Sequence, residues 1–281
     1  MTVDPVTEDD LRAYEKVVRE AFDRPLRLPN LIGVGCGRAG TSALYGLLRE
    51  TPSVHTSSVK ELNFFGVHEY PYHETGMSVT DYCRNFLNWN KERWCCEISP
   101  VYLTRPYSIE SIQKYYRNTD VRFIVQLRHP IERAVSQLWH FGGPGVYETE
   151  DSFFEAGLDT FTDDCFCDTQ WEEPAKVLAQ SIASNGLAAL IETFGRSAVI
   201  VLIYDELKFD PSIWANRLSA ALDVNVPTHA SPYYANAATP TKQGRIGPST
   251  HRRLTEFFEP ELKRLAALTD NAIVAQWAAN A

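Results

Sequence analysis

The stretch Leu31-Ile-Gly-Val-Gly-Cys-Gly-Arg-Ala-Gly-Thr-Ser42 decides the fold. Its first five residues predict a short buried strand, the glycines after them predict a tight turn, and a helix is expected over Thr41–Glu50. A helix that begins directly after a strand presents free backbone N–H groups and its positive end to the turn. We therefore expect an anion, and a phosphate in particular, to bind at residues 37–42.

Two ligand classes fit this turn. Gly35-x-Gly37-x-x-Gly40 matches the dinucleotide fingerprint, and Glu61 lies about twenty residues on, where an acid can bind a ribose. However, the sequence around Glu61 is typical of a loop that follows a strand, whereas a ribose-binding acid usually lies at the end of a clearly hydrophobic second strand. The second class is a phosphate loop, because a cation at Arg38 stands just before Gly40-Thr41-Ser42. The Walker A pattern is incomplete, which disfavours a magnesium-dependent kinase.

Strands and helices alternate outward from this turn. Val121–Leu127 is a nearly continuous apolar run of the kind found inside parallel sheets. The alternation predicts an α/β fold: a P-loop-like, three-layer architecture with a central, mostly parallel sheet flanked by helices. The other predicted strands are 54–59, 94–98 and 198–204, and the predicted helices are 78–89, 130 onward, 175–194 and 250–268.

We expect a single domain over residues 1–281. Helical spacing of apolar residues near the start predicts an N-terminal helical extension over residues 1–28. The stretch 142–170, which is rich in Gly, Pro and Asp, predicts a lid or an insertion. No change of composition requires a second domain.

The composition excludes several classes of protein. With 44% apolar and 22% charged residues, the chain is neither disordered nor collagen-like. The net charge of −9 argues against a general nucleic-acid binder. No signal peptide and no membrane span are visible, so we expect a cytoplasmic protein with mostly reduced cysteines. The spacings of Cys95-Cys96 and Cys165-x-Cys167 do not match common zinc modules, so no metal site is expected.

Three further segments follow the turn in a characteristic order: Lys60-Glu-Leu-Asn-Phe-Phe65, Leu127-Arg-His-Pro-Ile-Glu-Arg-Ala-Val-Ser136 and Lys242-Gln-Gly-Arg245. Taken together, the four segments resemble the sulfotransferases that use 3′-phosphoadenosine-5′-phosphosulfate (PAPS). The segment at Lys60 resembles the heparan-type (glycan) branch of that family. The resemblance spans nearly the whole chain.

The resemblance implies a division of labour in nucleotide binding. The 5′-phosphosulfate would be held by Gly37, Arg38, Ala39, Gly40, Thr41 and Ser42. The 3′-phosphate would be held by Arg128 and Ser136. The loop that closes over the nucleotide would contain Lys242, Gly244 and Arg245. Chemistry alone supports part of this. Arg128 ends a buried strand, and Ser136 lies about two helical turns further on, so both can reach one phosphate. Arg133, between them, is interpreted as a structural ion-pair partner.

The resemblance also implies the catalytic groups. Glu61 would be the general base, Arg38 would neutralise charge at the transferred group, and Lys60, Asn63 and Phe65 would contact the acceptor. The transfer is an in-line displacement that needs no metal. The chain departs from the family in three places. Arg38 replaces the loop lysine, Ile98 replaces a second lysine of the glycan-type enzymes, and the predicted helix near residues 181–184 lacks a tyrosine often found there.

Three hypotheses follow. The first is a PAPS-dependent sulfotransferase acting on a hydroxyl of a small-molecule, lipid or sugar acceptor. The second is an NAD(P)-dependent oxidoreductase that uses the glycine-rich turn. The third is a catalytically degenerate nucleotide-binding protein, motivated by Arg38 and Ile98. The net charge and the missing lysine disfavour a polysulfated glycan as acceptor, and the oligomeric state does not follow from the sequence.

Overall fold

The centre of the molecule is a parallel sheet. In the computed structural model the described residues contain five strands in the order β2-β3-β1-β4-β5, and every neighbouring pair is parallel. The strands are β1 (Leu31–Gly35), β2 (Val54–Thr56), β3 (Trp94–Ile98), β4 (Arg122–Leu127) and β5 (Val199–Ile203). The structure describes residues 26–68, 76–105, 107–116, 120–166, 172–228 and 246–281.

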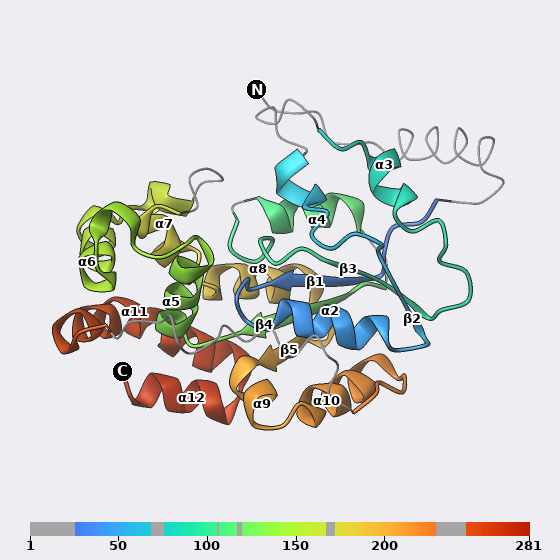
Figure 1. Cartoon of the computed structure of the whole chain (residues 1–281). Coiled ribbons are helices and arrows are strands. Elements are labelled where there is room, and N and C mark those ends of the chain that lie inside the picture. The colour runs from blue at the N-terminus through green and yellow to red at the C-terminus, as the bar shows by residue number, and fades with distance from the viewer. Residues whose placement is uncertain (1–25, 69–75, 106, 117–119, 167–171, 229–245) are drawn as a thin grey trace.

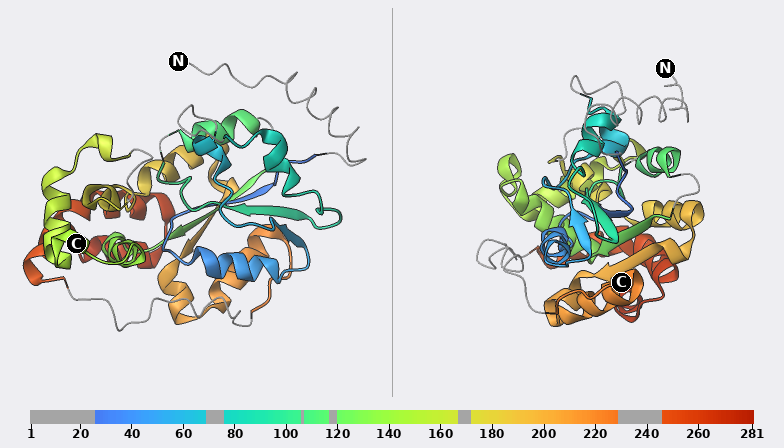
Figure 2. Two further views of the ribbon diagram at one scale, coloured as in Figure 1. Left: turned by 45° about the horizontal axis from the view of Figure 1, so that its top comes forward. Right: turned by 90° about the vertical axis from the view of Figure 1, so that its right-hand side faces the viewer.

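Helices cover both faces of this sheet (Figure 1). One face buries Leu31, Ile98 and Ile124 against α2 (Thr41–Arg49) and α10 (Ser212–Leu222). The other face buries alternate residues of the same strands, because side chains alternate along a strand. The helices on that face include α3 (Val79–Arg84), α4 (Ser108–Tyr115) and α8 (Ser184–Phe194), as Figure 2 also shows. The predicted three-layer α/β architecture is confirmed.

A third apolar cluster lies to one side of the sheet, at the left of Figure 1. Helix α6 contributes Phe153 and Phe154 to it, and both side chains are buried. Within the predicted 142–170 segment, α6 is therefore packed against the rest of the molecule, and the interpretation as a lid or an insertion stays a prediction. The cluster joins α5 (Pro130–His140), α6 (Glu150–Thr160), α7 (Pro174–Ala179) and α11 (Pro248–Thr269).

Several helices differ from the predictions, including α4, α6 and α10, which were not expected. The single helix expected over 175–194 is broken, because the chain between α7 and α8 turns around a buried carboxylate. The backbone N–H groups of Ala183 and Ser184 donate to Glu261 Oε1 at 2.8 and 2.9 Å. Helix α12 (Ala272–Ala279) was not expected; it packs Trp277 against the sheet. Residues 1–25 of the predicted extension lie outside the described residues, and 26–28 are not helical.

The remaining elements are short. Within η1, Phe65 and Gly66 have non-helical backbone angles, so this segment is an irregular turn. In the ranges given above, no helix is long and apolar enough to cross a membrane. The short elements are η1 (Phe64–His68), η2 (Gly145–Tyr147), η3 (Asp163–Phe166), η4 (Arg196–Ala198) and α9 (Tyr204–Phe209).

Candidate active site

The glycine-rich turn forms a loop between β1 and α2, called here the phosphate loop (residues 36–40). Gly35 precedes it with φ 119°, and a Cβ there would lie 2.0 Å from the carbonyl oxygen of Pro100. Gly40 ends it with φ 88° against Trp214, so only glycine fits either position. Gly40 gives α2 no side-chain cap. The first N–H groups of α2 therefore carry no capping side chain, as an anion site requires.

Two arginines of the β4–α5 segment hold carbonyl groups of this loop. Arg128 Nη1 donates to the carbonyl oxygen of Arg38 at 3.2 Å, and Arg133 Nε donates to that of Gly37 at 3.1 Å. Two successive carbonyls are thereby engaged by cations. A carbonyl oxygen repels a phosphate, so their engagement leaves the loop free to present N–H groups to an anion.

The predicted 3′- and 5′-phosphate residues lie in direct contact. Arg38 Nε donates to Ser136 Oγ at 3.2 Å, and Arg38 Nη1 lies 3.3 Å from His140 Nδ1. Burial, and then Arg128, lowers the pKa of Arg38 from its usual value; a guanidinium remains charged at neutral pH. Burial and Arg38 also lower the pKa of His140. The neutral ring can accept from Arg38 through Nδ1.

Arg128 lies at the carboxyl end of β4, as predicted. Its guanidinium stacks on the ring of Tyr204, with 4.6 Å between the guanidinium carbon and the ring centroid. Its Nε donates to Glu132 at 3.3 Å. The side chain thus spans the gap between α5 and the start of α9. Tyr204 was not singled out from the sequence; its place directly after the buried strand β5 is the signal that marks it.

Arg133 is not the ion-pair partner that we predicted. It is 3% exposed, and its donors go to oxygen atoms of uncharged groups, including Ser181 Oγ at 2.8 Å. No carboxylate among the described residues forms an ion pair with it. The prediction failed because the neighbouring acid on α5, Glu132, points to solvent and pairs with Arg128 and Lys208 instead.

The second predicted segment forms a loop beside α2, called here the acceptor loop (residues 60–65). Lys60 Nζ donates to Thr41 Oγ1 at 3.3 Å and pairs with the carboxylate of Glu61. The N–H of Glu61 donates to the carbonyl of Ile98 at 3.0 Å, which fixes the residue over the end of β3. The side chain of Glu61 is 46% exposed. Lys60 therefore connects the phosphate loop to the Glu61 carboxylate.

A buried acid supports the acceptor loop. Glu97 is fully buried, and its Oε1 accepts from the hydroxyl groups of Ser99 and Tyr102. Those hydroxyls in turn accept from the N–H groups of Asn63 at 2.9 Å and Phe64 at 2.8 Å. Burial raises the pKa of Glu97 to about 8. We did not predict this role; the signal was an acid inside the buried strand Trp94–Ile98.

Phe65 has to be corrected as an acceptor contact. Its side chain is fully buried, and its ring packs edge-on against Phe64, Tyr82 and Tyr102. No surface of the ring is left for a ligand, so its role is packing. Asn63 is half-buried, but its Oδ1 atom is itself buried and has no hydrogen-bond partner among the described residues. Its contact with the acceptor stays a prediction.

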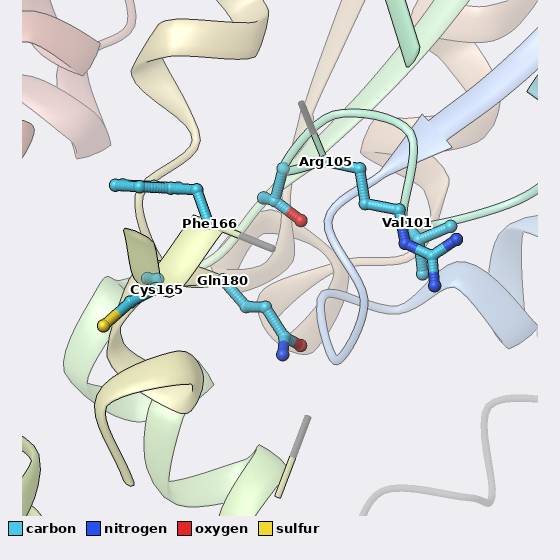
Figure 3. Close-up of a pocket in the computed structure, with 7 residues that line it drawn as sticks. Val101, Arg105, Cys165, Phe166 and Gln180 are labelled. Carbon is cyan, nitrogen blue, oxygen red and sulfur yellow. The ribbon is translucent and has the colours of Figure 1, made fainter. Parts of the chain in front are cut away.

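A cavity of about 300 Å³ opens between α4 and the start of α8. A narrower pocket adjoins it, and Thr104, Arg105 and Phe166 line both. Figure 3 shows the narrower pocket, with Arg105 and Gln180 on its walls. Its lining residue Val101 follows Pro100, which packs on the phosphate loop. The two pockets share these lining residues and are called here the linked cavities.

The remaining predictions concern the C-terminal loop and the cysteines. Lys242, Gly244 and Arg245 lie outside the described residues. Cys36, Cys83, Cys95 and Cys96 are buried free thiols, and burial raises the pKa of Cys36 to about 12. In the part of the chain that the structure describes, no three metal-binding side chains lie together.

The strand order separates the two ligand classes of the glycine-rich turn. In a dinucleotide-binding fold, the strand after the turn pairs with β1 and carries the ribose-binding acid. Here β3 lies between β1 and β2, so Glu61 does not follow a strand adjacent to β1. The geometry therefore does not favour the oxidoreductase interpretation.

Comparison with known proteins agrees with this geometry. No protein-family model matches the chain. The chain is 27% identical over 117 residues to the membrane-associated sulfotransferase kil1 of Dictyostelium discoideum, a match that covers 41% of this chain and 23% of that protein. The chain thus spans under a quarter of the length of this curated relative.

Solved structures share the fold. A sulfotransferase from Alicyclobacillus acidocaldarius superposes with a TM-score of 0.71 at 24% identity, over 89% of this chain and 99% of that one. Mouse sulfotransferase SULT7A1, complexed with PAP, superposes with a TM-score of 0.50 at 13% identity, over 100% of this chain and 96% of that one. The chain thus shares its fold with solved sulfotransferases and is similar in part of its sequence to a curated one. These similarities do not distinguish the heparan-type branch.

Proposed function

We propose that this chain is a sulfotransferase that transfers a sulfuryl group from PAPS to the hydroxyl group of a compact acceptor. The observation that carries the proposal is the contact between two anion-binding clusters. Arg38 of the phosphate loop bonds to both Arg128 and Ser136, at 3.2 Å each. One nucleotide with a phosphate at each end of its ribose can therefore engage both clusters.

The residues fit such a nucleotide in charge as well as in place. The start of α2 lacks a side-chain cap, and Arg38, Arg128 and Arg133 surround the phosphate loop. Backbone N–H groups at a helix start and planar guanidinium groups are the usual ligands of phosphate oxygens. We assign the 5′-phosphosulfate to residues 37–42 and the 3′-phosphate to Arg128 and Ser136.

The sulfuryl transfer requires two functions from the residues of this chain: charge neutralisation on the leaving phosphate and removal of the acceptor proton. PAPS, when bound, supplies a sulfuryl group on a phosphate that can leave. The bond between sulfur and the acceptor oxygen forms as the bond between sulfur and the phosphate oxygen breaks. Arg38 and the amide groups of the phosphate loop neutralise the charge that grows on the phosphate. The carboxylate of Glu61 accepts the proton of the acceptor hydroxyl.

Lys60 supplies a compact ammonium group, which neither Arg38 nor Ile98 provides. Its ammonium group lies between Thr41 and Glu61, where the two loops meet. A compact ammonium can follow charge as it moves from the acceptor toward the leaving phosphate. This position favours an active enzyme over a catalytically degenerate nucleotide-binding protein.

The linked cavities favour a small acceptor with an apolar body. Leu103, Ile109, Ile182 and Ala189 line the larger one, whose volume of about 300 Å³ suits a small molecule. Arg105 and Glu110 are its charged lining residues and have opposite signs. We therefore expect an uncharged alcohol or phenol rather than a sulfated sugar chain.

Turnover of sulfur-labelled PAPS with a panel of alcohols, phenols and sugars tests the proposal. We expect label on at least one hydroxyl acceptor. Calorimetry should detect adenosine 3′,5′-bisphosphate (PAP) and give no heat with NADH. Binding of NADH with no response to PAP would support the oxidoreductase hypothesis instead.

A further inference from the structure

Two successive carbonyl groups of the phosphate loop are held by two arginines that lie five residues apart. Arg128 holds the carbonyl of Arg38 and belongs to the nucleotide site proposed above. Arg133 holds the carbonyl of Gly37 at 3.1 Å, and the proposed mechanism gives it no role. Arg133 lies under the loop, on the side of α5, and is 3% exposed.

The guanidinium of Arg133 connects the loop to the layer of helices behind it. Its Nη1 donates to Ser181 Oγ at 2.8 Å and reaches the carbonyl of Val177 at 3.5 Å. Its Nη2 donates to Gln137 Oε1 at 3.4 Å. The rigid, planar guanidinium group thus connects Gly37 by hydrogen bonds to α5, to α7 and to the turn after α7.

No carboxylate of the described residues forms an ion pair with Arg133. Its neighbours at hydrogen-bond distance are carbonyl, hydroxyl and amide oxygens. Burial lowers the pKa of Arg133 to about 10, so the group remains a cation at neutral pH. Burying a cation without a carboxylate costs free energy. An anion bound at the phosphate loop would offset that cost through the low-dielectric interior.

We propose that Arg133 is a positioning residue for the 5′-phosphosulfate. It holds the Gly37 carbonyl away from the anion and supplies a buried positive charge beneath the N–H groups of residues 38–42. This inference rests on the proposed function, because it takes the 5′ end of PAPS as the anion. It assigns Arg133 to the 5′ end of the nucleotide and leaves the 3′ end to Arg128 and Ser136.

The test compares two ligands that differ only at the 5′ end. Calorimetry measures the affinity of PAP and of adenosine 3′-phosphate for the full chain and for Arg133→Met. We expect Arg133→Met to weaken PAP binding by about 10- to 100-fold, the effect of losing a charged hydrogen bond. Adenosine 3′-phosphate should lose less than about threefold, since it places no charge on the loop. An equal loss for both ligands, or no loss, would overturn the inference.

Matched variants separate positioning from general stability. Arg217→Met removes a partly buried arginine of α10, which pairs with Glu206 and makes no hydrogen bond or ion pair with the described residues of the phosphate loop. It should lower the melting temperature and leave the ratio of the two affinities unchanged. Arg133→Lys should recover part of the PAP affinity, because it restores the charge. If Arg133→Met does not fold, Ser181→Ala is the substitute, because it removes one hydrogen-bond acceptor of the Arg133 guanidinium. Ser181→Ala should lower the ratio of PAP affinity to adenosine 3′-phosphate affinity by a smaller factor.

Amide hydrogen exchange without ligand keeps the inference separate from the proposed function. The amides of residues 37–42 should exchange about tenfold faster in Arg133→Met and at the wild-type rate in Arg217→Met. A wild-type chain that binds no PAP would contradict the proposed function, while the exchange rates would still decide whether Arg133 holds the loop. Unchanged exchange in Arg133→Met would contradict the positioning role.

Discussion

The phosphate loop and the acceptor loop lie side by side at the carboxyl edge of the sheet, but they are held in opposite ways. Arg128 and Arg133 hold the phosphate loop by its carbonyl groups. The acceptor loop is held by its N–H groups, through the hydroxyls of Ser99 and Tyr102, which both end on Glu97.

The difference follows from what each loop has to present. Arginines that hold the phosphate loop by its carbonyl groups leave its N–H groups available to an anion. They also make the electrostatic potential at the loop more positive. The acceptor loop is held through its N–H groups by hydroxyl groups rather than by arginines, so the carboxylate of Glu61 can remain a base. Lys60 is the one residue described above that touches both, through Thr41 and Glu61.

The largest effect should come from Glu61→Gln, which removes the proposed base and keeps the size of the side chain. We expect turnover with PAPS to fall by about 10²- to 10³-fold while PAP affinity changes less than about threefold. Steady-state kinetics and calorimetry measure the two quantities. Glu148→Gln, at an exposed glutamate before α6, is the control. Wild-type turnover in Glu61→Gln would place the base elsewhere.

Arg128→Ala tests the phosphate loop, which the two arginines hold by its carbonyl groups. It should weaken PAP binding by about 10- to 100-fold, because the 3′-phosphate loses a charged partner. Adenosine 5′-phosphate should be affected far less, since it lacks that group. The ratio of the two affinities, measured by calorimetry, isolates the 3′ contact from the bond between Arg128 and the Arg38 carbonyl. A ratio equal to that of the wild type would remove Arg128 from the 3′-phosphate site.

Glu97→Gln tests how Glu97 supports the acceptor loop, through the pH dependence of the melting temperature. Burial raises the pKa of Glu97 to about 8 from its ordinary 4.5, so between these pH values the folded chain keeps a proton that the unfolded chain loses. Wild-type stability should therefore fall as pH rises through this window. Gln cannot titrate, so the melting temperature of the variant relative to wild type should rise by at least about 3 °C from pH 5.5 to pH 8.5. A difference independent of pH would mean that Glu97 is ionised throughout.

The parts of this site that the sequence predicted depend on local signals. Gly35 and Gly40 mark a strand–turn–helix because the backbone there requires glycine, and Arg128 and Ser136 follow the clearest apolar strand in the chain. Their side-by-side position then follows from the parallel sheet, whose strands all end at the same edge.

The parts that were missed depend on contacts between distant residues. Arg133 meets a carbonyl 96 residues away, so its sequence neighbours suggested an ion pair instead. Phe65 was assigned to the acceptor because aromatic residues suit both pockets and cores; its burial depends on Tyr82 and Tyr102. Glu97 could be suspected only as an acid in a buried strand, since its hydroxyl partners lie in the turn that follows.

The central claim is that one nucleotide engages both anion clusters at once, and its affinity for the wild-type chain measures this directly. Calorimetry with PAP, adenosine 5′-phosphate and adenosine 3′-phosphate under one set of conditions is sufficient. If the clusters act together, PAP binds about 100-fold or more tightly than either monophosphate. Equal affinities for PAP and one of the monophosphates would contradict the account, because the second cluster would then contribute nothing.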